Sequence, residues 1–116
     1  MIYFKHHEFD CPTKKGTGEL MEVKFLEMLD DARHIAKIPF YINSGYRTPE
    51  HNKSIGGNPN SSHMKFCAAD IHCANGQDRL TMVHALIKVG FRRIGIANTF
   101  IHIDTDRNKP HSIWLY

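Results

Sequence analysis

The stretch SSHMKFCAADIHC, residues 61–73, passes from turn-forming residues into a segment with the residue types of a β-strand. Just before it, GGNPNSS at residues 56–62 consists of turn formers and predicts an exposed loop. After the loop, CAADIHC at residues 67–73 predicts a strand. His63 lies at the end of the loop and Asp70 within the strand, so this transition sets where both side chains can lie.

Three further strands are expected in the C-terminal third of the chain. RRIGIA at residues 92–97 and FIHIDTD at residues 100–106 are separated by a short turn and can pair as a hairpin, and SIWLY at residues 112–116 closes the chain. Side chains two positions apart on a strand share a face. The second strand of the hairpin therefore presents His102 and Asp104 on the same side.

Helical spacing of apolar residues predicts two longer helices, at residues 21–36 and 76–90. A short helix begins with Thr48 as its N-cap and Pro49 at its first position. PFYINS at residues 39–44 has the residue types of a short strand. Together these elements predict an α+β fold in which helices pack against a mostly antiparallel sheet.

Length and composition fit one domain that spans residues 1–116. Hydrophobic residues make up 41% and charged residues 23%, the balance of a soluble globular protein. The net charge of +3 without a basic run does not indicate a nucleic-acid partner. No apolar stretch reaches signal-peptide or membrane-span length, so we expect no membrane insertion.

The cysteines do not form a recognisable metal or disulfide pattern. Cys11, Cys67 and Cys73 are odd in number and include no C-x-x-C pair. Neither a disulfide framework nor a four-cysteine zinc site is therefore expected. We expect three packed thiols.

His63, Asp70 and His102 form one possible set of three zinc ligands. A catalytic zinc site takes three protein ligands from His, Asp, Glu or Cys and leaves a position open for water. Spacing alone leaves a second interpretation open, in which these are a loop histidine, an edge-strand acid and an ordinary sheet histidine, because H-x6-D is a weak pattern.

Three ordered blocks of the sequence carry a resemblance that favours the metal site. They are SGYRTPEHNKSIGG at residues 44–57, NSSHMKFCAADIH at residues 60–72 and GIANTFIHIDTD at residues 95–106. The blocks resemble those of the zinc D-alanyl-D-alanine carboxypeptidase family. That family includes phage L-alanyl-D-glutamate endopeptidases and shares its fold with the Hedgehog signalling domain.

The resemblance implies one Zn²⁺ per chain. The pattern S-x-H-x6-D of the family corresponds to Ser61, His63 and Asp70, and the histidine of its H-x-D strand corresponds to His102. By the same resemblance Arg47 holds the substrate near the scissile carbonyl, where a fixed guanidinium can stabilise a developing oxyanion. The alternative for Arg47 is a surface arginine paired with an acid.

Residues next to these blocks are expected to contact substrate or to complete the chemistry. We expect Ser61 and His51 to contact substrate. Many similar proteins carry an acid three residues before the last histidine, where this chain has Thr99. Asp104 is then the candidate general base, or alternatively an acceptor that orients a zinc histidine.

Two further positions bear on the cleft. Similar proteins often have a glycine where Phe66 stands, so the packing beside the site is expected to differ. For Trp114 we expect core packing rather than a place in the wall of the site.

The resemblance implies a zinc peptidase that acts on the peptide stems of bacterial peptidoglycan, as a D-Ala-D-Ala carboxypeptidase or an L-Ala-D-Glu endopeptidase. The alternative is a non-catalytic zinc-stabilised module that binds the cell wall or a protein. Thr99 favours the module, whereas Arg47 and Asp104 favour the enzyme. We expect a monomer that is made in the cytoplasm without a signal peptide and acts on the cell wall, as a phage lysin does.

Overall fold

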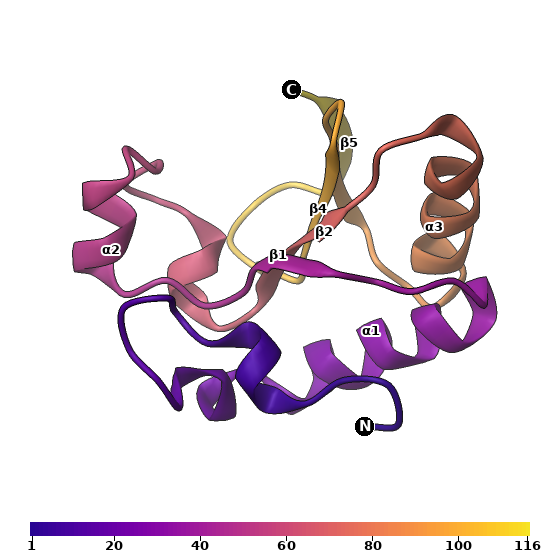
Figure 1. Ribbon diagram of the computed structural model, residues 1–116. Helices are drawn as coiled ribbons and strands as arrows, with labels where there is room; N and C mark the ends of the chain where they lie inside the picture. Colours follow the sequence, from indigo (N-terminus) through magenta and orange to yellow (C-terminus); the bar gives the residue numbers. More distant parts are fainter.

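A five-stranded sheet forms the centre of the computed structural model, which describes residues 1–116 (Figure 1). Its strands lie in the order β1-β2-β4-β3-β5, and all neighbours are antiparallel except β3 and β5. The predicted α+β fold with a mostly antiparallel sheet is therefore confirmed. The strands are β1 (Ile42–Ser44), β2 (Ala68–His72), β3 (Arg93–Ile96), β4 (Phe100–Asp104) and β5 (Ser112–Leu115).

Three α-helices and three short 3₁₀ helices complete the fold. They are η1 (His6–Phe9), η2 (Thr17–Leu20), α1 (Val23–Ala36), α2 (Pro49–Ser54), η3 (Ser62–Lys65) and α3 (Gly76–Lys88). The predicted start of the short helix is confirmed, since the Thr48 side chain accepts a hydrogen bond from the His51 backbone N–H and Pro49 is the first helical residue. None of the helices has the length and apolar character needed to cross a membrane.

The structure differs from the sequence expectation at two places. The strand expected from residue 39 begins only at Ile42. Pro39 has no N–H to donate to a sheet, and the first hydrogen bond to β2 is the one that the Tyr41 carbonyl oxygen accepts from the His72 N–H. The expectation of an exposed loop up to residue 62 is wrong at its end, because Ser61 and Ser62 are buried. Ser61 caps η3 and Ser62 begins it.

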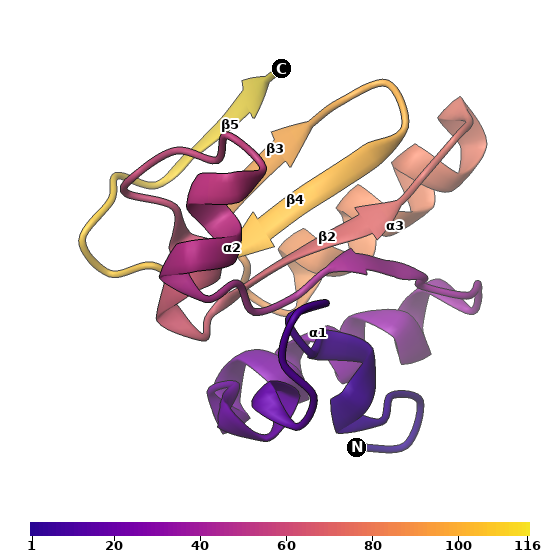
Figure 2. The same ribbon diagram turned by 60° about the vertical axis from the view of Figure 1, so that its left-hand side comes forward.

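The two faces of the sheet have different chemistry. One face is apolar and packs against α1 and α3, whereas α2 lies on the other side (Figure 2). The core residues supplied by the sheet are Ala69, Ile71, Ile94, Ile101 and Ile103. They alternate with polar residues along β2 and β4, so the face opposite α1 and α3 carries the polar side chains.

One row of residues runs across this polar face. Asp70 on β2 pairs with His102 on β4, His102 pairs with Gly95 on β3, and Gly95 pairs with Trp114 on β5. The register therefore places two of the predicted metal ligands side by side. It also places an aromatic residue on the same row, two strands away from His102.

All three cysteines are free and buried, as the sequence predicts. For Cys67, burial raises the pKa to about 11, so its thiol stays protonated at neutral pH. The Cys67 thiol therefore acts as a packed group, whereas the Cys11 sulfur accepts a hydrogen bond from the Thr48 backbone N–H.

Candidate metal centre and cleft

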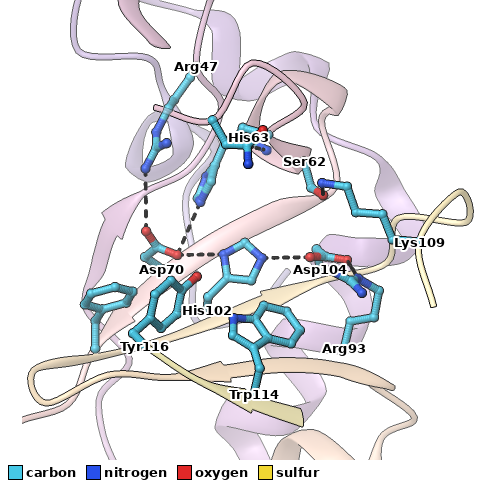
Figure 3. A pocket seen from close by; sticks show the side chains of 13 residues that line it. Arg47, Ser62, His63, Asp70, Arg93, His102, Asp104, Lys109, Trp114 and Tyr116 are labelled. Carbon is cyan, nitrogen blue, oxygen red and sulfur yellow. Dashed lines mark hydrogen bonds and ion pairs between the residues drawn. The ribbon is translucent and has the colours of Figure 1, made fainter. Parts of the chain in front are cut away.

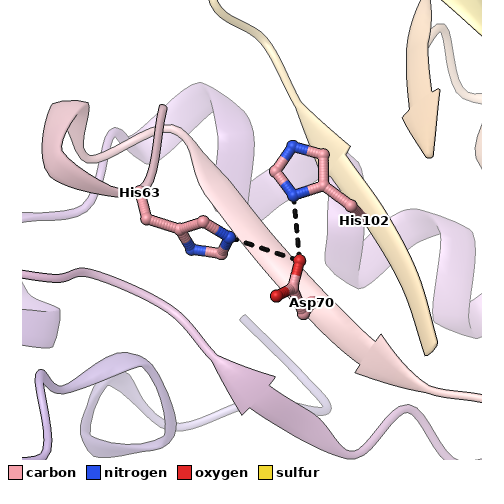
Figure 4. A group of neighbouring side chains, drawn as sticks. All are labelled: His63, Asp70 and His102. Atoms are coloured by element: carbon pink, nitrogen blue, oxygen red, sulfur yellow. Dashed lines mark hydrogen bonds and ion pairs between the residues drawn. The ribbon is translucent and has the colours of Figure 1, made fainter. Parts of the chain in front are cut away.

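Three side chains from three different elements converge at one point of the polar face (Figure 4). His63 comes from η3, Asp70 from β2 and His102 from β4. Asp70 Oδ1 lies 3.2 Å from His63 Nε2 and 2.9 Å from His102 Nδ1. One ligand atom from each residue lies within 4.8 Å of the others. Atoms that share a tetrahedral zinc ion lie roughly 3.3 Å apart, so this spacing suits the ion.

The second nitrogen of each histidine already has a partner. His63 Nδ1 lies 2.7 Å from the Gly45 carbonyl oxygen, and His102 Nε2 lies 2.7 Å from Asp104 Oδ2. A carbonyl oxygen can only accept, so His63 must carry its proton on Nδ1. A carboxylate likewise favours the proton of His102 on Nε2. The neutral rings then direct lone pairs from His63 Nε2 and His102 Nδ1 at Asp70.

This arrangement leaves three acceptor atoms facing one another, which only protons or a cation can satisfy. Burial by itself would raise the pKa of Asp70, but protons on His102 Nδ1 and His63 Nε2 let both rings donate to its carboxylate, and these hydrogen bonds hold this pKa well below its usual range. Burial alone would lower the pKa of His102, whereas the carboxylates of Asp104 and Asp70 raise it overall. Two imidazoles and a carboxylate with fixed outer partners are a donor set that zinc prefers. The residues therefore fit a zinc ion.

The segment before α2 holds His63 in place through Gly45. The Gly45 carbonyl accepts the proton of His63 Nδ1. A Cβ atom at Gly45 would lie 2.6 Å from backbone atoms of Phe9, closer than any side chain tolerates. Only glycine therefore allows this close approach, and the SGYR block has a structural reason at its second position.

Arg47 extends from the same segment into the site, as the resemblance implies. Its Nε donates to Ser44 Oγ at 3.1 Å and its Nη1 donates to Asn52 Oδ1 at 3.3 Å. Nη2 lies 3.7 Å from Asp70 Oδ2. These contacts fix the plane of the guanidinium beside the candidate metal centre. An arginine on the open surface would not be held from three directions.

Asp104 is enclosed on all sides. Its Oδ2 faces His102 Nε2, while Oδ1 accepts hydrogen bonds from Arg93 Nε at 2.7 Å and from the Asp106 backbone N–H at 3.0 Å. The side chain is 0% exposed. Burial would raise its pKa, but the hydrogen bonds from His102, Asp106 and Arg93 lower it overall.

The three candidate ligands His63, Asp70 and His102 line a cleft of about 380 Å³ (Figure 3). Asp70 and Asp104 are the only carboxylates in its lining, whereas Arg47, Arg93 and Lys109 supply cationic groups. Phe100, Trp114 and Tyr116 form an aromatic side. The remaining lining residues are Asn58, Ser61, Ser62, His63 and His102.

The other predicted site residues lie in different places. Ser61 lines the cleft, and its Oγ accepts a hydrogen bond from the His63 backbone N–H at 3.2 Å. His51 lies on α2 and is not among the residues that line the cleft. Thr99 is exposed in the turn between β3 and β4. The expected core packing of Trp114 is wrong, since its indole lines the cleft with its ring centre 5.7 Å from that of His102.

Six lining residues are not singled out by any pattern in the sequence, namely Asn58, Ser62, Arg93, Phe100, Lys109 and Tyr116. For Arg93 the hairpin contains a usable signal, because a turn of known length between β3 and β4 would set the register and place Arg93 opposite Asp104. Lys109 and Tyr116 depend on how the segment after β4 folds back onto the sheet.

The chain matches the model of a known protein family. The model of the peptidase M15 family matches residues 2–104, which include β1 to β4 and every residue of the candidate metal centre. No curated protein matches the chain. Since the family match spans nearly the whole chain and contains the convergent His63, Asp70 and His102, the chain belongs to the peptidase M15 family.

Proposed function

We propose that the protein is a zinc peptidase that hydrolyses the peptide stems of bacterial peptidoglycan. The observation that carries the proposal is the convergence of His63 Nε2, Asp70 Oδ1 and His102 Nδ1 in a chain of a peptidase family. The outward nitrogen of each histidine is held by another group, so the ring orientations suit metal binding.

His63, Asp70 and His102 would hold the ion in the cleft. When bound, zinc supplies a Lewis acid for a peptide carbonyl and acidifies a water molecule to a pKa of roughly 7. Ser61 supports this set by holding the backbone of His63. The open side of the cleft provides room for a peptide stem.

Arg47 is proposed to hold the substrate carbonyl. Its guanidinium lies beside Asp70, and its side chain is 16% exposed and lines the cleft, so a bound peptide can reach it. A planar cation fixed by Ser44 and Asn52 stabilises negative charge on a carbonyl oxygen without first reorganising.

For Asp104 the geometry favours orientation of His102 over proton abstraction. Both of its oxygens already accept hydrogen bonds, and none of its surface is exposed. A general base needs an oxygen within reach of the proton it removes. We therefore propose that Asp104 keeps His102 in the orientation that directs Nδ1 at the metal.

One observation favours a second function. The position three residues before His102 is the exposed Thr99, and the cleft contains no carboxylate other than Asp70 and Asp104. A cleft without a free carboxylate is what a non-catalytic zinc module would have. Such a module would bind peptidoglycan or a protein through the same face.

Incubation of the zinc-loaded protein with purified sacculi decides between the two functions. Mass spectrometry of the released material distinguishes free D-alanine, the product of a carboxypeptidase, from stem peptides that begin with D-glutamate, the product of an L-Ala-D-Glu endopeptidase. His63→Ala should release nothing, whereas His72→Ala, an exposed histidine on β2, should behave as the wild type. If the protein binds zinc but releases no fragment, the peptidase is excluded and the non-catalytic binding module is supported.

A further inference from the structure

We propose that Arg93 is a positioning residue of the metal centre, which acts through Asp104 on His102. Its guanidinium holds the Asp104 carboxylate in the one place where that carboxylate fixes the ring of His102. The inference rests on the proposed zinc site and assigns a role to a residue that lies outside the ligand set.

The sheet register brings the three residues together. In the β3–β4 pair, Ile94 lies opposite Ile103 and Gly95 opposite His102, so Arg93 stands next to Asp104 across the two strands. Arg93 Nε donates to Asp104 Oδ1 at 2.7 Å, and His102 Nε2 lies 2.7 Å from Asp104 Oδ2. The carboxylate therefore bridges the guanidinium and the imidazole, one oxygen to each.

This chain of contacts is shielded from water. The side chains of Arg93, Asp104 and His102 are 11%, 0% and 8% exposed. Charge-assisted hydrogen bonds are stronger and more directional in such surroundings than at a surface. Without Arg93, Oδ1 of this buried carboxylate would keep only the hydrogen bond from the Asp106 backbone N–H and would lose its cation, so the carboxylate would be free to shift.

Arg93 itself is held by two further groups. Its Nη1 donates to the Pro110 carbonyl oxygen, and its guanidinium carbon lies 4.8 Å from the centre of the Trp114 ring. Figure 3 shows the guanidinium between Asp104 and Trp114, on the side of the cleft opposite Arg47. The planar guanidinium of Arg93 thus contacts a carboxylate, a carbonyl oxygen and an aromatic ring at once. A lysine ammonium cannot make this set of contacts.

Two accounts of Arg93 predict opposite effects on zinc affinity. If Arg93 positions Asp104, its removal loosens His102 and weakens zinc binding. If it acts only as a nearby positive charge, its removal relieves repulsion of the metal and strengthens zinc binding. Zinc affinity therefore separates the two accounts without any measurement of peptidase activity.

The experiment measures zinc dissociation constants by competition with a chromophoric chelator. Arg93→Gln should bind zinc about 10-fold more weakly than the wild type, as loss of an outer partner of a metal ligand does. Arg93→Lys should restore only part of that loss. Arg92→Gln is the matched control, because Arg92 is exposed and donates only to backbone carbonyls of Ile87 and Phe91.

A double-mutant cycle tests whether Arg93 acts through Asp104. The zinc affinity of Arg93→Gln combined with Asp104→Asn should equal that of Asp104→Asn alone, since the bridging carboxylate is already gone. Additive losses, or an Arg93→Gln affinity equal to or tighter than the wild type, would overturn the inference. Circular dichroism verifies that each variant is folded, and Arg93→Lys carries the test if Arg93→Gln is not.

The cycle also separates this inference from the proposed function. Failure of the wild type to bind zinc would overturn the zinc site and the role of Arg93 with it. Zinc binding by the wild type with unchanged affinity in Arg93→Gln would overturn the role of Arg93 alone.

Discussion

Gly95 and Trp114 lie opposite each other on β3 and β5, and a Cβ atom at Gly95 would stand 2.6 Å from the indole Nε1 of Trp114. The same Cβ would lie 2.7 Å from a ring carbon of Tyr116. Both aromatic rings therefore lie over a glycine, and this lets the indole approach His102 from the side. The aromatic side of the cleft therefore depends on Gly95 having no side chain.

Gly95→Ala should displace Trp114 and Tyr116 from the cleft wall. Trp114 is the only tryptophan in the chain, so its fluorescence reports the change directly. We expect the emission maximum to move to longer wavelength and the KM for stem peptides to rise several-fold. Zinc affinity should stay within about 2-fold, because none of the candidate ligands is on β3 or β5. Gly76→Ala is the control, since a Cβ there meets nothing within 4 Å. Unchanged emission would contradict this view of the wall.

Phe66 occupies a left-handed backbone conformation, with φ of 63°. Its ring stacks on Tyr46 with centroids 4.4 Å apart. Phe66→Ala keeps the strain and loses the stacking, whereas Phe66→Gly loses the stacking but relieves the strain. The glycine variant should therefore be more stable than the alanine variant by about 1 kcal/mol.

Urea denaturation measures this difference in the free energy of unfolding. Lys37 offers a matched comparison, because its φ is 58° and it stacks on no aromatic ring. The free energy of unfolding of Lys37→Gly should exceed that of Lys37→Ala by a similar amount. An alanine variant at position 66 that is as stable as the glycine variant would show that the backbone there is not strained.

Asp106 ties the loop after β4 to η3 by accepting hydrogen bonds from Ser62 Oγ at 2.7 Å and Lys65 Nζ at 3.0 Å. Burial alone would raise its pKa, but these two groups hold it well below the usual range. The unfolded chain therefore binds a proton more readily than the folded chain as the pH falls. The stability contributed by Asp106 is present above pH about 4 and is lost below it.

Asp106→Asn should lower the free energy of unfolding at pH 7 by about 1 to 3 kcal/mol, because a buried charged acceptor is removed from its cation. The difference in the free energy of unfolding between Asp106→Asn and the wild type should become smaller as the pH falls from 5 to about 3. Denaturant unfolding at several pH values measures it, with the exposed Asp31→Asn as the control. A gap that does not change with pH would exclude the charge as its origin.

The chemistry of individual blocks could be read from the sequence, and long-range pairing could not. The alternation of apolar and polar residues predicts the face that carries Asp70, His102 and Asp104, because it is a local property of each strand. Trp114 reaches the cleft only because β5 pairs in parallel with β3, and no local pattern in SIWLY specifies that partner. The contact of Arg93 with Asp104 depends on the register of the β3–β4 hairpin, which requires the exact length of the turn and not only the pattern of each strand.

Arg47→Ala should lower turnover of stem peptides on the order of 10²-fold, as removal of an oxyanion donor does. Folding should be nearly unchanged, and so should zinc affinity, because Nη2 lies 3.7 Å from Asp70 and makes no short bond to it. Arg47→Lys should restore activity only partly, since it lacks the planar fork that contacts Ser44 and Asn52. Single-turnover kinetics with zinc at saturation measure the effect. Turnover equal to the wild type would remove Arg47 from the mechanism.

Asp104→Asn distinguishes the two roles of this carboxylate. If Asp104 orients His102, the change weakens zinc affinity by about 10- to 100-fold, because an amide is a poorer acceptor for His102 Nε2–H. Activity should then return when zinc is added in excess. If Asp104 were the general base, zinc would stay bound while activity fell by roughly 10² to 10⁴.

We expect weakened zinc affinity, since both oxygens of Asp104 already accept hydrogen bonds and its side chain has no exposed surface. A zinc titration followed by an activity assay at saturating zinc separates the outcomes. Full loss of activity with unchanged zinc affinity would return Asp104 to the role of proton acceptor.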